Sequence, residues 1–283
     1  MAVRRLPDLS PVQVVRLQDA LLANANTLLT SALALLDVGH GALARSLAIL
    51  GLEESGKAIA VHERRVEMCH IADGEPFRCD RLDELWGSHE KKLEAVHRFL
   101  VEERYWFGVE PSDPGENAAY LGTIRSWARR HDRSKQRGFY VGLSKTGEVM
   151  APSDVSDDAD MREVIARVHQ IGWQLRLGEH IEGKKQDEKA AGLPPLNDDD
   201  LAWLALDESE ELDDVVKEFR ADLQRSLREG VPGESLPNSA YRFNPPDADR
   251  SPFRNVGKPG YEAETRELMR LARDLRQEDD EQA

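Results

Sequence analysis

The chain has 283 residues, of which 40% are hydrophobic and 32% are charged, and its formal net charge is −15. This length fits one large domain or a domain with an appendage, and the apolar share suffices for a packed core. No run approaches the ~20 apolar residues that span a bilayer, and the N-terminal stretch lacks the apolar block of a signal peptide. We therefore expect a soluble, cytoplasmic protein without a membrane partner.

Helical periodicity dominates the first 180 residues. Apolar residues recur every three or four positions, and runs rich in glycine, proline and aspartate separate the periodic segments. Pro11 after Ser10 marks the start of the first helix. The carboxylates that follow Ser156 favour a helix start there, which is the last one in these 180 residues. The expected helices are Val12 to Leu36, Ala42 to about His70, Asp80 to about Gly108, Glu116 to about Arg130, and Ser156 to about Glu179.

One stretch departs from the helical pattern. Phe139 to Leu143 is rich in bulky apolar residues and suits a short extended segment, with Lys145 to Gly147 as a turn. No internal repeat of fixed period is visible. The first part of the chain therefore predicts an all-α bundle with one short extended insertion.

The C-terminal third carries most of the acidity. Residues 186–283 hold 25 acidic and 13 basic side chains, against 28 and 25 in residues 1–185. Residues 183–200 have the composition of a linker. Residues 201–283 are expected to form an acidic extension that is partly helical and partly irregular. Its expected helices are Leu201 to Glu229 and Tyr261 to Arg276. The extension has too few apolar residues for its own core, so it either stays solvated or packs on the bundle or a partner.

The cysteines give no sign of a metal site. Cys69 and Cys79 are the only cysteines, and no Cys/His set has the spacing of zinc ligands. Two thiols in a chain without an export signal are expected to stay free. The sequence therefore predicts neither a metal nor another cofactor.

Charged side chains interrupt the apolar stripes of two expected helices. Glu54 and Lys57 lie on the stripe of the second helix, and His89 lies on that of the third. Such positions are costly for a charge unless it meets a partner. The residues therefore form either a buried network that fixes helix register or a catalytic cluster on two packed helices, and spacing alone leaves both open.

Three segments together resemble the AbiV family of abortive-infection proteins. They are ARSLAILGLEESGKA (44–58), SHEKKLEAV (88–96) and KQRGFYVGLSKTGEVMAPSDVS (135–156), and the resemblance covers roughly residues 10–182. The family belongs to the HEPN superfamily of helical domains, so the resemblance implies a HEPN-like bundle over residues 1–182. Gly142 stands where members commonly have Asp.

The resemblance implies antiviral defence in a prokaryote. Many HEPN domains are metal-independent ribonucleases that act as homodimers. The implied function is therefore cleavage of host or phage RNA after an infection trigger, which would make the protein a toxin, with a phage-encoded activator as an expected partner. The alternative is a non-catalytic module that binds RNA or protein, senses a phage component, or blocks translation by binding.

The chemistry of RNA cleavage assigns roles to the residues of this resemblance. Without a metal, it needs a base for the 2′-hydroxyl, an acid for the 5′-oxygen and cations for the phosphorane. His89 suits proton transfer because histidine titrates near neutrality, and Lys92 follows one helical turn later. Lys57 would add positive charge, Glu54 would orient His89 or a lysine, and Glu53 has the spacing of an intrahelical pair with Lys57. The predicted catalytic residues are His89, Lys92, Lys57 and Glu54.

A basic run is the best candidate for an RNA-binding surface. The predicted contacts are Arg129, Arg130, Lys135 and Arg137, with Tyr140 available to stack on a base. The acidic extension would suit a regulatory role, covering this run at rest as an internal mimic of nucleic acid.

The usual HEPN signature is an Arg followed by four to six residues and then a His. Arg65 with His70 and Arg125 with His131 fit that spacing. Neither pair belongs to the segments that carry the AbiV resemblance, so both remain lesser catalytic candidates.

Overall fold

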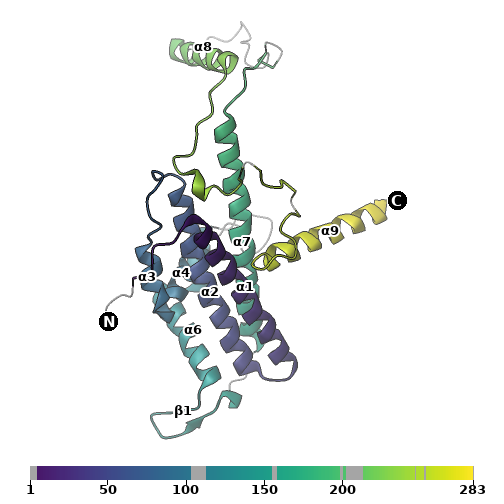
Figure 1. Cartoon of the computed structure of the whole chain (residues 1–283). Coiled ribbons are helices and arrows are strands. Elements are labelled where there is room, and N and C mark those ends of the chain that lie inside the picture. The colour runs from purple at the N-terminus through teal and green to yellow at the C-terminus, as the bar shows by residue number, and fades with distance from the viewer. Residues whose placement is uncertain are drawn as a thin grey trace.

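The computed structural model shows a helical bundle built around one long helix, α2 (Figure 1). It describes residues 5–102, 113–154, 158–197, 200–201, 213–245, 247–251 and 253–282. The expected all-α bundle with a short extended insertion is confirmed. Its helices are α1 (Pro11–Asp37), α2 (Gly41–Met68), α3 (Asp80–Trp86), α4 (His89–Glu102), α5 (Pro114–Leu121), α6 (Ile124–Phe139), α7 (Asp158–Ala191), α8 (Asp214–Glu229) and α9 (Glu262–Gln282).

Helix α1 begins where the sequence predicts. The Ser10 side chain accepts from the backbone N–H of Gln13, the Gln13 side chain accepts from that of Ser10, and Pro11 fills the first helical position. Gly39, with φ of 84°, then turns the chain back into α2. Within the described residues, α1 alone has the length and hydropathy of a membrane span, as core helices can. It packs along α2 and buries Val14 and Leu29.

Helix α2 is the centre of the bundle, and it buries residues on nearly every side. Its residues Ile49, Leu52, Ile59 and Val61 are at most 1% exposed. Helices α1, α4, α6 and α7 all pack against it, so any side chain on α2 lies close to several other elements. This arrangement places the segment with the candidate residues Glu54 and Lys57 in the middle of the molecule.

Two of the expected helices are each divided by a glycine. The expected helix from Asp80 breaks at Gly87, which ends α3, and the Ser88 hydroxyl then accepts from the backbone N–H of Lys91 in the first turn of α4. Similarly, Gly122 has a φ of 76° and separates α5 from α6, which Thr123 caps. His89 therefore stands at the first position of a helix rather than in the middle of one. The expected end near Gly108 and the cap at Ser156 lie outside the described residues.

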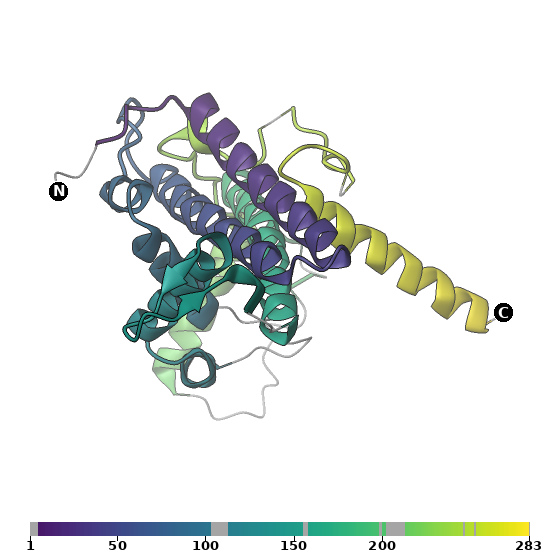
Figure 2. The same cartoon turned by 90° about the horizontal axis from the view of Figure 1, so that it is seen from below.

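The predicted extended insertion is a small antiparallel hairpin. Strand β1 (Gly142–Leu143) pairs with β2 (Val149–Met150), and Gly147 in the turn has a φ of 87°. A 3₁₀ turn, η1 (Pro152–Asp154), follows it. The hairpin lies next to the end of α6, on the side of the bundle away from α9 (Figure 2).

Helix α7 runs well beyond its predicted end near Glu179. It continues to Ala191, so the first half of the expected linker 183–200 is helical. The C-terminal segment stabilises this extra helix: the Gln186 side chain accepts from the backbone N–H of Phe243, and Asp187 pairs with Arg242 at 2.5 Å. Gly183, which sequence patterning suggests as a break, lies instead where the Asn244 side chain contacts the helix.

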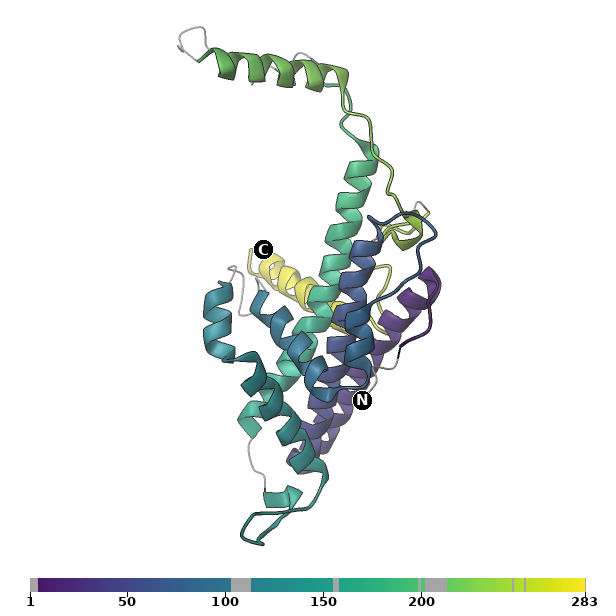
Figure 3. The same cartoon turned by 90° about the vertical axis from the view of Figure 1, so that its left-hand side faces the viewer.

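The described part of the C-terminal extension contains two helices, α8 and α9, and the irregular segment between them. We call this segment, residues 230–261, the strap. Tyr241 and Phe243 of the strap join the core, and a second 3₁₀ turn, η3 (Ser239–Tyr241), lies within it. Helix α9 packs on α7, whereas α8 is held away from the bundle beyond the end of α7 (Figure 3). The part of the expected helix 201–229 before residue 213 lies largely outside the described residues. The extension therefore packs on the bundle through the strap and α9.

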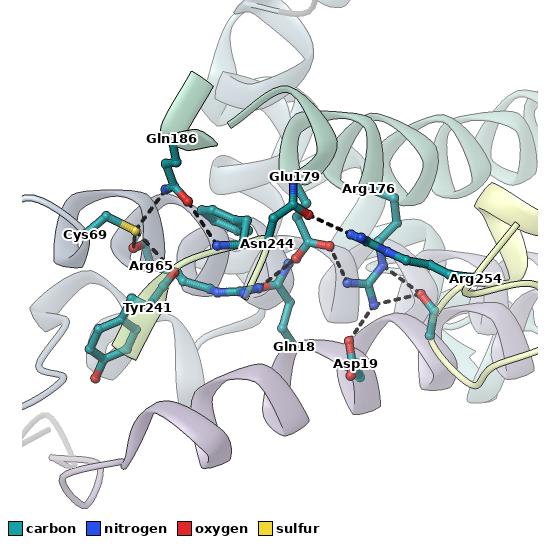
Figure 4. Close-up of polar contacts among 12 residues, drawn as sticks. Gln18, Asp19, Arg65, Cys69, Arg176, Glu179, Gln186, Tyr241, Asn244 and Arg254 are labelled. Atoms are coloured by element: carbon teal, nitrogen blue, oxygen red, sulfur yellow. Dashed lines mark hydrogen bonds and ion pairs between the residues drawn. The ribbon is translucent and has the colours of Figure 1, made fainter. Parts of the chain in front are cut away.

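A buried carboxylate anchors the strap. Glu179 of α7 accepts from Gln18, from Arg65 at 2.9 Å and from Arg176 at 2.8 Å (Figure 4). Arg176, 1% exposed, also donates to Asp19 and to the carbonyl oxygen of Gly260. Burial by itself would raise the pKa of the Glu179 carboxyl, but the charges of Arg176 and Arg65 outweigh burial and lower this pKa.

Candidate active site on helices α2, α4 and α6

One buried carboxylate, Glu53 of α2, contacts side chains from two other helices, α4 and α6. It is 2% exposed. Its Oε2 lies 2.6 Å from Nδ1 of His89 and 3.5 Å from Nζ of Lys92, and its Oε1 lies 2.5 Å from Nζ of Lys135. The three segments that carry the AbiV resemblance thus meet at one acidic residue. We call Glu53, His89, Lys92 and Lys135 the Glu53 cluster.

Two glycines allow the helices to approach closely enough for these contacts. A Cβ atom on Gly56 of α2 would lie 2.4 Å from the carbonyl oxygen of Lys92. A Cβ atom on Gly138 of α6 would lie 2.1 Å from Ser46 Oγ, on α2. Real Cβ atoms do not approach other atoms this closely, so only glycine permits either crossing. Gly56 and Gly138 therefore bring α4 and α6 within reach of Glu53.

His89 is the part of the cluster that meets solvent. Its side chain is 54% exposed, whereas those of Lys92 and Lys135 are 11% and 4% exposed. A carboxylate only accepts, so the His89 Nδ1–H donates to Glu53 and the lone pair of the neutral ring is on Nε2. Nε2 has no hydrogen-bond partner among the described residues. The arrangement is a carboxylate-oriented imidazole whose second nitrogen is open to a ligand.

Glu54 and Lys57 form a separate pair. Their side chains lie 2.7 Å apart at 17% and 11% exposure, and the Lys57 ammonium lies 4.8 Å from the centroid of the Trp86 ring. The expectation that Glu54 orients a lysine fits this geometry, but Glu53 and not Glu54 contacts His89. The suggested pair of Glu53 with Lys57 is wrong, because the rotation of α2 turns Glu53 toward α4 and α6.

Lys135 does not lie on the predicted RNA-binding surface. Besides Glu53, its ammonium contacts Asp132 at 2.9 Å, and its backbone carbonyl accepts from the Ser46 hydroxyl. A lysine that is 4% exposed and held by two carboxylates is not available to an RNA phosphate. The position of Lys135 does not support the predicted RNA contact and indicates that Lys135 holds α6 and Glu53 together.

The remaining predicted RNA contacts do lie on the surface. The exposed side of α6 carries five arginines: Arg125, Arg129, Arg130, Arg133 and Arg137. Arg129 pairs with Glu90 at 3.3 Å, and the other four have no carboxylate partner among the described residues. Tyr140, directly after α6, is 66% exposed. The described part of the acidic extension does not cover this arginine row: α9 leaves the bundle on the other side (Figure 1).

Neither Arg-to-His pair forms a site. Arg65 is bound to Glu179 and lies over the Phe243 ring, while His70 is exposed at the end of α2. His131 is 7% exposed, and its Nδ1–H donates to the carbonyl oxygen of Trp127. Burial lowers the pKa of His131 to about 4. Arg65 and His131 thus lie in the packing of the bundle, whereas His70 and Arg125 are exposed.

A family model described as AbiV, of the HEPN type, matches residues 13–173. The chain belongs to the AbiV family. No curated protein and no solved structure matches it. Membership in this family of HEPN-type abortive-infection proteins indicates a role in antiphage defence. The match ends within α7, so α8, the strap and α9 lie outside it.

Sequence reasoning missed Glu53 as the residue that joins the cluster. Glu53 and Glu54 are adjacent, and periodicity cannot decide which of two neighbouring carboxylates faces another helix. The missed signal is the pair of glycines, Gly56 and Gly138, which mark where α4 and α6 cross α2. Glu53 and Glu54 both lie between these two crossings, so the glycines mark the pair, and the rotation of α2 decides that Glu53 contacts α4 and α6.

Proposed function

We propose that this AbiV-family protein is a metal-independent endoribonuclease that cleaves host or phage RNA during abortive infection. The observation that carries the proposal is the Glu53–His89 pair, with the imidazole oriented by a buried carboxylate and Nε2 facing solvent. This is the arrangement that general acid–base catalysis requires.

In the proposed reaction, His89 Nε2 takes the proton of a ribose 2′-hydroxyl. The 2′-oxygen attacks the adjacent phosphorus, and the bond to the 5′-oxygen breaks, which gives a 2′,3′-cyclic phosphate and a 5′-hydroxyl. Glu53 stabilises the imidazolium that forms, as a carboxylate does for a catalytic histidine. Lys92, which shares Glu53 Oε2 with His89, supplies positive charge to the phosphorane and a proton to the leaving oxygen. Lys57, one turn from Glu53 on α2, adds further positive charge.

The arginine row of α6 is proposed to hold the RNA backbone. In a chain of net charge −15, residues 124–139 contain six basic residues and one acidic residue. Four exposed arginines that have no carboxylate partner in the described part of the chain form a surface to which phosphates bind with release of counterions. We expect the logarithm of RNA affinity to fall linearly with the logarithm of salt concentration, with a shallower slope in Arg130→Ala/Arg133→Ala.

The proposed setting follows from the family. The protein would act in the cytoplasm as a homodimer, as a toxin to the infected cell, after activation by a phage-encoded protein. Sedimentation measures the dimer directly: a monomer at micromolar concentration would contradict it.

A second candidate function is RNA or protein binding without cleavage, by which the protein senses a phage component or blocks translation. Lys92 and Lys135 favour it, because both are largely buried and committed to Glu53 rather than free to meet a phosphate. In that case the Glu53 cluster is a structural network and the arginine row alone is functional.

The end groups of the RNA products separate the two candidates. A defined single-stranded RNA is incubated with the protein in EDTA, beside the same RNA with a 2′-deoxyribose at the cleaved position. The nuclease predicts a 2′,3′-cyclic phosphate end and no cleavage at the deoxy position. Binding of both RNAs with no cleavage would support the non-catalytic module, and cleavage at the deoxy position would exclude the proposed chemistry.

A further inference from the structure

The β1–β2 hairpin exposes an unusual concentration of bulky apolar side chains. Tyr140 is 66%, Leu143 70% and Val149 66% exposed, and Val141 and Met150 are 67% and 38% exposed. All five lie within eleven residues. Single exposed apolar residues are ordinary on a protein surface, but a contiguous group marks a place where something binds.

A pocket of about 420 Å³ lies between the hairpin and the last turn of α6. Tyr140, Val141 and Met150 give it apolar walls, while Arg137 and Asp154 place charged groups on its lining. Asp154 accepts from the backbone N–H of Ala151 at 2.8 Å, which fixes this side of the pocket. Its volume is within the range of about 300–1,000 Å³ found for pockets that hold small ligands or parts of larger ones.

The surroundings of the pocket suit a polyanion. The arginine row of α6 ends at Arg137, which lines the pocket, and Tyr140 follows three residues later. The arginine row, the pocket and Tyr140 therefore form one continuous surface along α6 and past its end.

We propose that this pocket binds one unstacked base of a single-stranded RNA, with the Tyr140 ring stacked on the base and Arg137 on the adjoining phosphate. The inference rests on the proposed function, since it adds a base subsite to the same RNA-binding surface. Aromatic rings beside a positive groove are the usual means by which proteins hold single strands. A duplex cannot use the subsite because its bases stay paired and stacked. The occupant is RNA rather than protein because the apolar pocket adjoins arginines that have no carboxylate partners among the described residues.

The test measures binding by fluorescence anisotropy in the His89→Ala background, which prevents cleavage. The probes are a labelled 12-nucleotide RNA and the same strand in a perfect duplex. Tyr140→Ala should weaken single-strand affinity about 5- to 150-fold, the equivalent of about 1–3 kcal/mol for one stacked base, and leave duplex affinity unchanged. Tyr140→Phe should retain affinity because it keeps the ring. Tyr120→Ala, at a tyrosine 59% exposed on α5, is the matched control and should have no effect.

The other outcomes separate the claims. If His89→Ala binds neither probe, and wild type also leaves RNA unbound and intact, the proposed function and the subsite fail together. If RNA binds and Tyr140→Ala binds the single strand as well as its parent does, the subsite alone is wrong. A Tyr140→Ala protein that changes its sedimentation mass but keeps its RNA affinity would assign the hairpin to a protein contact and overturn the inference.

Discussion

Among the described residues, the carboxylates of Glu179 and Glu53 each contact positively charged side chains, at least one of them from another helix, and they differ in what surrounds them. Glu179 is held by Arg65 and Arg176, whose side chains are 8% and 1% exposed, and the C-terminal strap closes over them. Glu53 is held by two lysines and by His89, which is 54% exposed. The cations that hold Glu179 are both buried, whereas the Glu53 cluster ends at a side chain that meets solvent.

The chemistry of the partners accounts for this difference. A guanidinium is planar, stays charged and donates in several fixed directions, so Arg176 can join α7 to α1 and to the strap at once. An imidazole changes its protonation near neutral pH and has a second nitrogen for a ligand. The contacts of Glu179 therefore favour a role in stability, and the proposed function assigns Glu53 to catalysis.

The largest effect on stability is expected at Glu179. Glu179→Gln keeps the shape of the side chain but leaves Arg65 and Arg176 buried without their common carboxylate. Breaking such a pair costs about 3–5 kcal/mol of unfolding free energy, which urea denaturation measures. Glu182→Gln, one turn away in a pair at the surface, is the control and should change stability by less than about 1 kcal/mol. Equal stability of the two variants would refute the structural role of Glu179.

A smaller effect is expected where α6 crosses α2. Gly138→Ala places a methyl group against Ser46 and the Ala42 carbonyl oxygen, and such overpacking costs about 1–3 kcal/mol. The shift of α6 also moves Lys135 from Glu53, so RNA cleavage should fall even at temperatures where the variant is folded. Gly87→Ala is the control, because a Cβ there meets nothing within 4 Å. Full activity of folded Gly138→Ala would separate Lys135 from the function of the cluster.

Part of the pH dependence of stability is expected to come from the buried His131. Burial lowers the pKa of His131 from 6.5 to about 4, so the native state disfavours its protonated form. Its contribution is complete above pH 6.5 and is lost as the pH falls from 6.5 toward 4, by about 2 kcal/mol at pH 5. His131→Phe should show a smaller loss of stability between pH 7.5 and 5 in denaturation experiments. A loss as large as that of wild type would contradict the assignment.

The sequence predicts much of the bundle but only part of the site. Periodicity and end signals locate α1 and α2 within a few residues, and the spacing of His89 and Lys92 correctly places both on the face toward α2. Glu53 is missed because its role depends on how α2 is rotated between two other helices. The extra length of α7 is missed for a similar reason: Phe243, 57 residues away, stabilises it through Gln186. Local periodicity does not predict contacts between segments that are distant in the sequence.

The same limit explains the arginines and lysines of α6. The sequence pattern of a basic run does not tell which of its side chains face solvent and which face the core. Packing against α2 turns Lys135 inward, while Arg130 and Arg137 stay exposed. The run thus contains both a structural cation and a row of surface cations, and only the structure separates them.

The most direct test of the account compares wild type with His89→Ala on total cellular RNA in EDTA, with circular dichroism and urea denaturation of both proteins. Because His89 is half exposed at the first position of α4, the variant should lose no more than about 1 kcal/mol of stability. Loss of a general base typically costs about 10²- to 10⁴-fold in rate, so cleavage should fall below detection. Equal cleavage by a well-folded His89→Ala protein would contradict the account and leave the Glu53 cluster as a structural network.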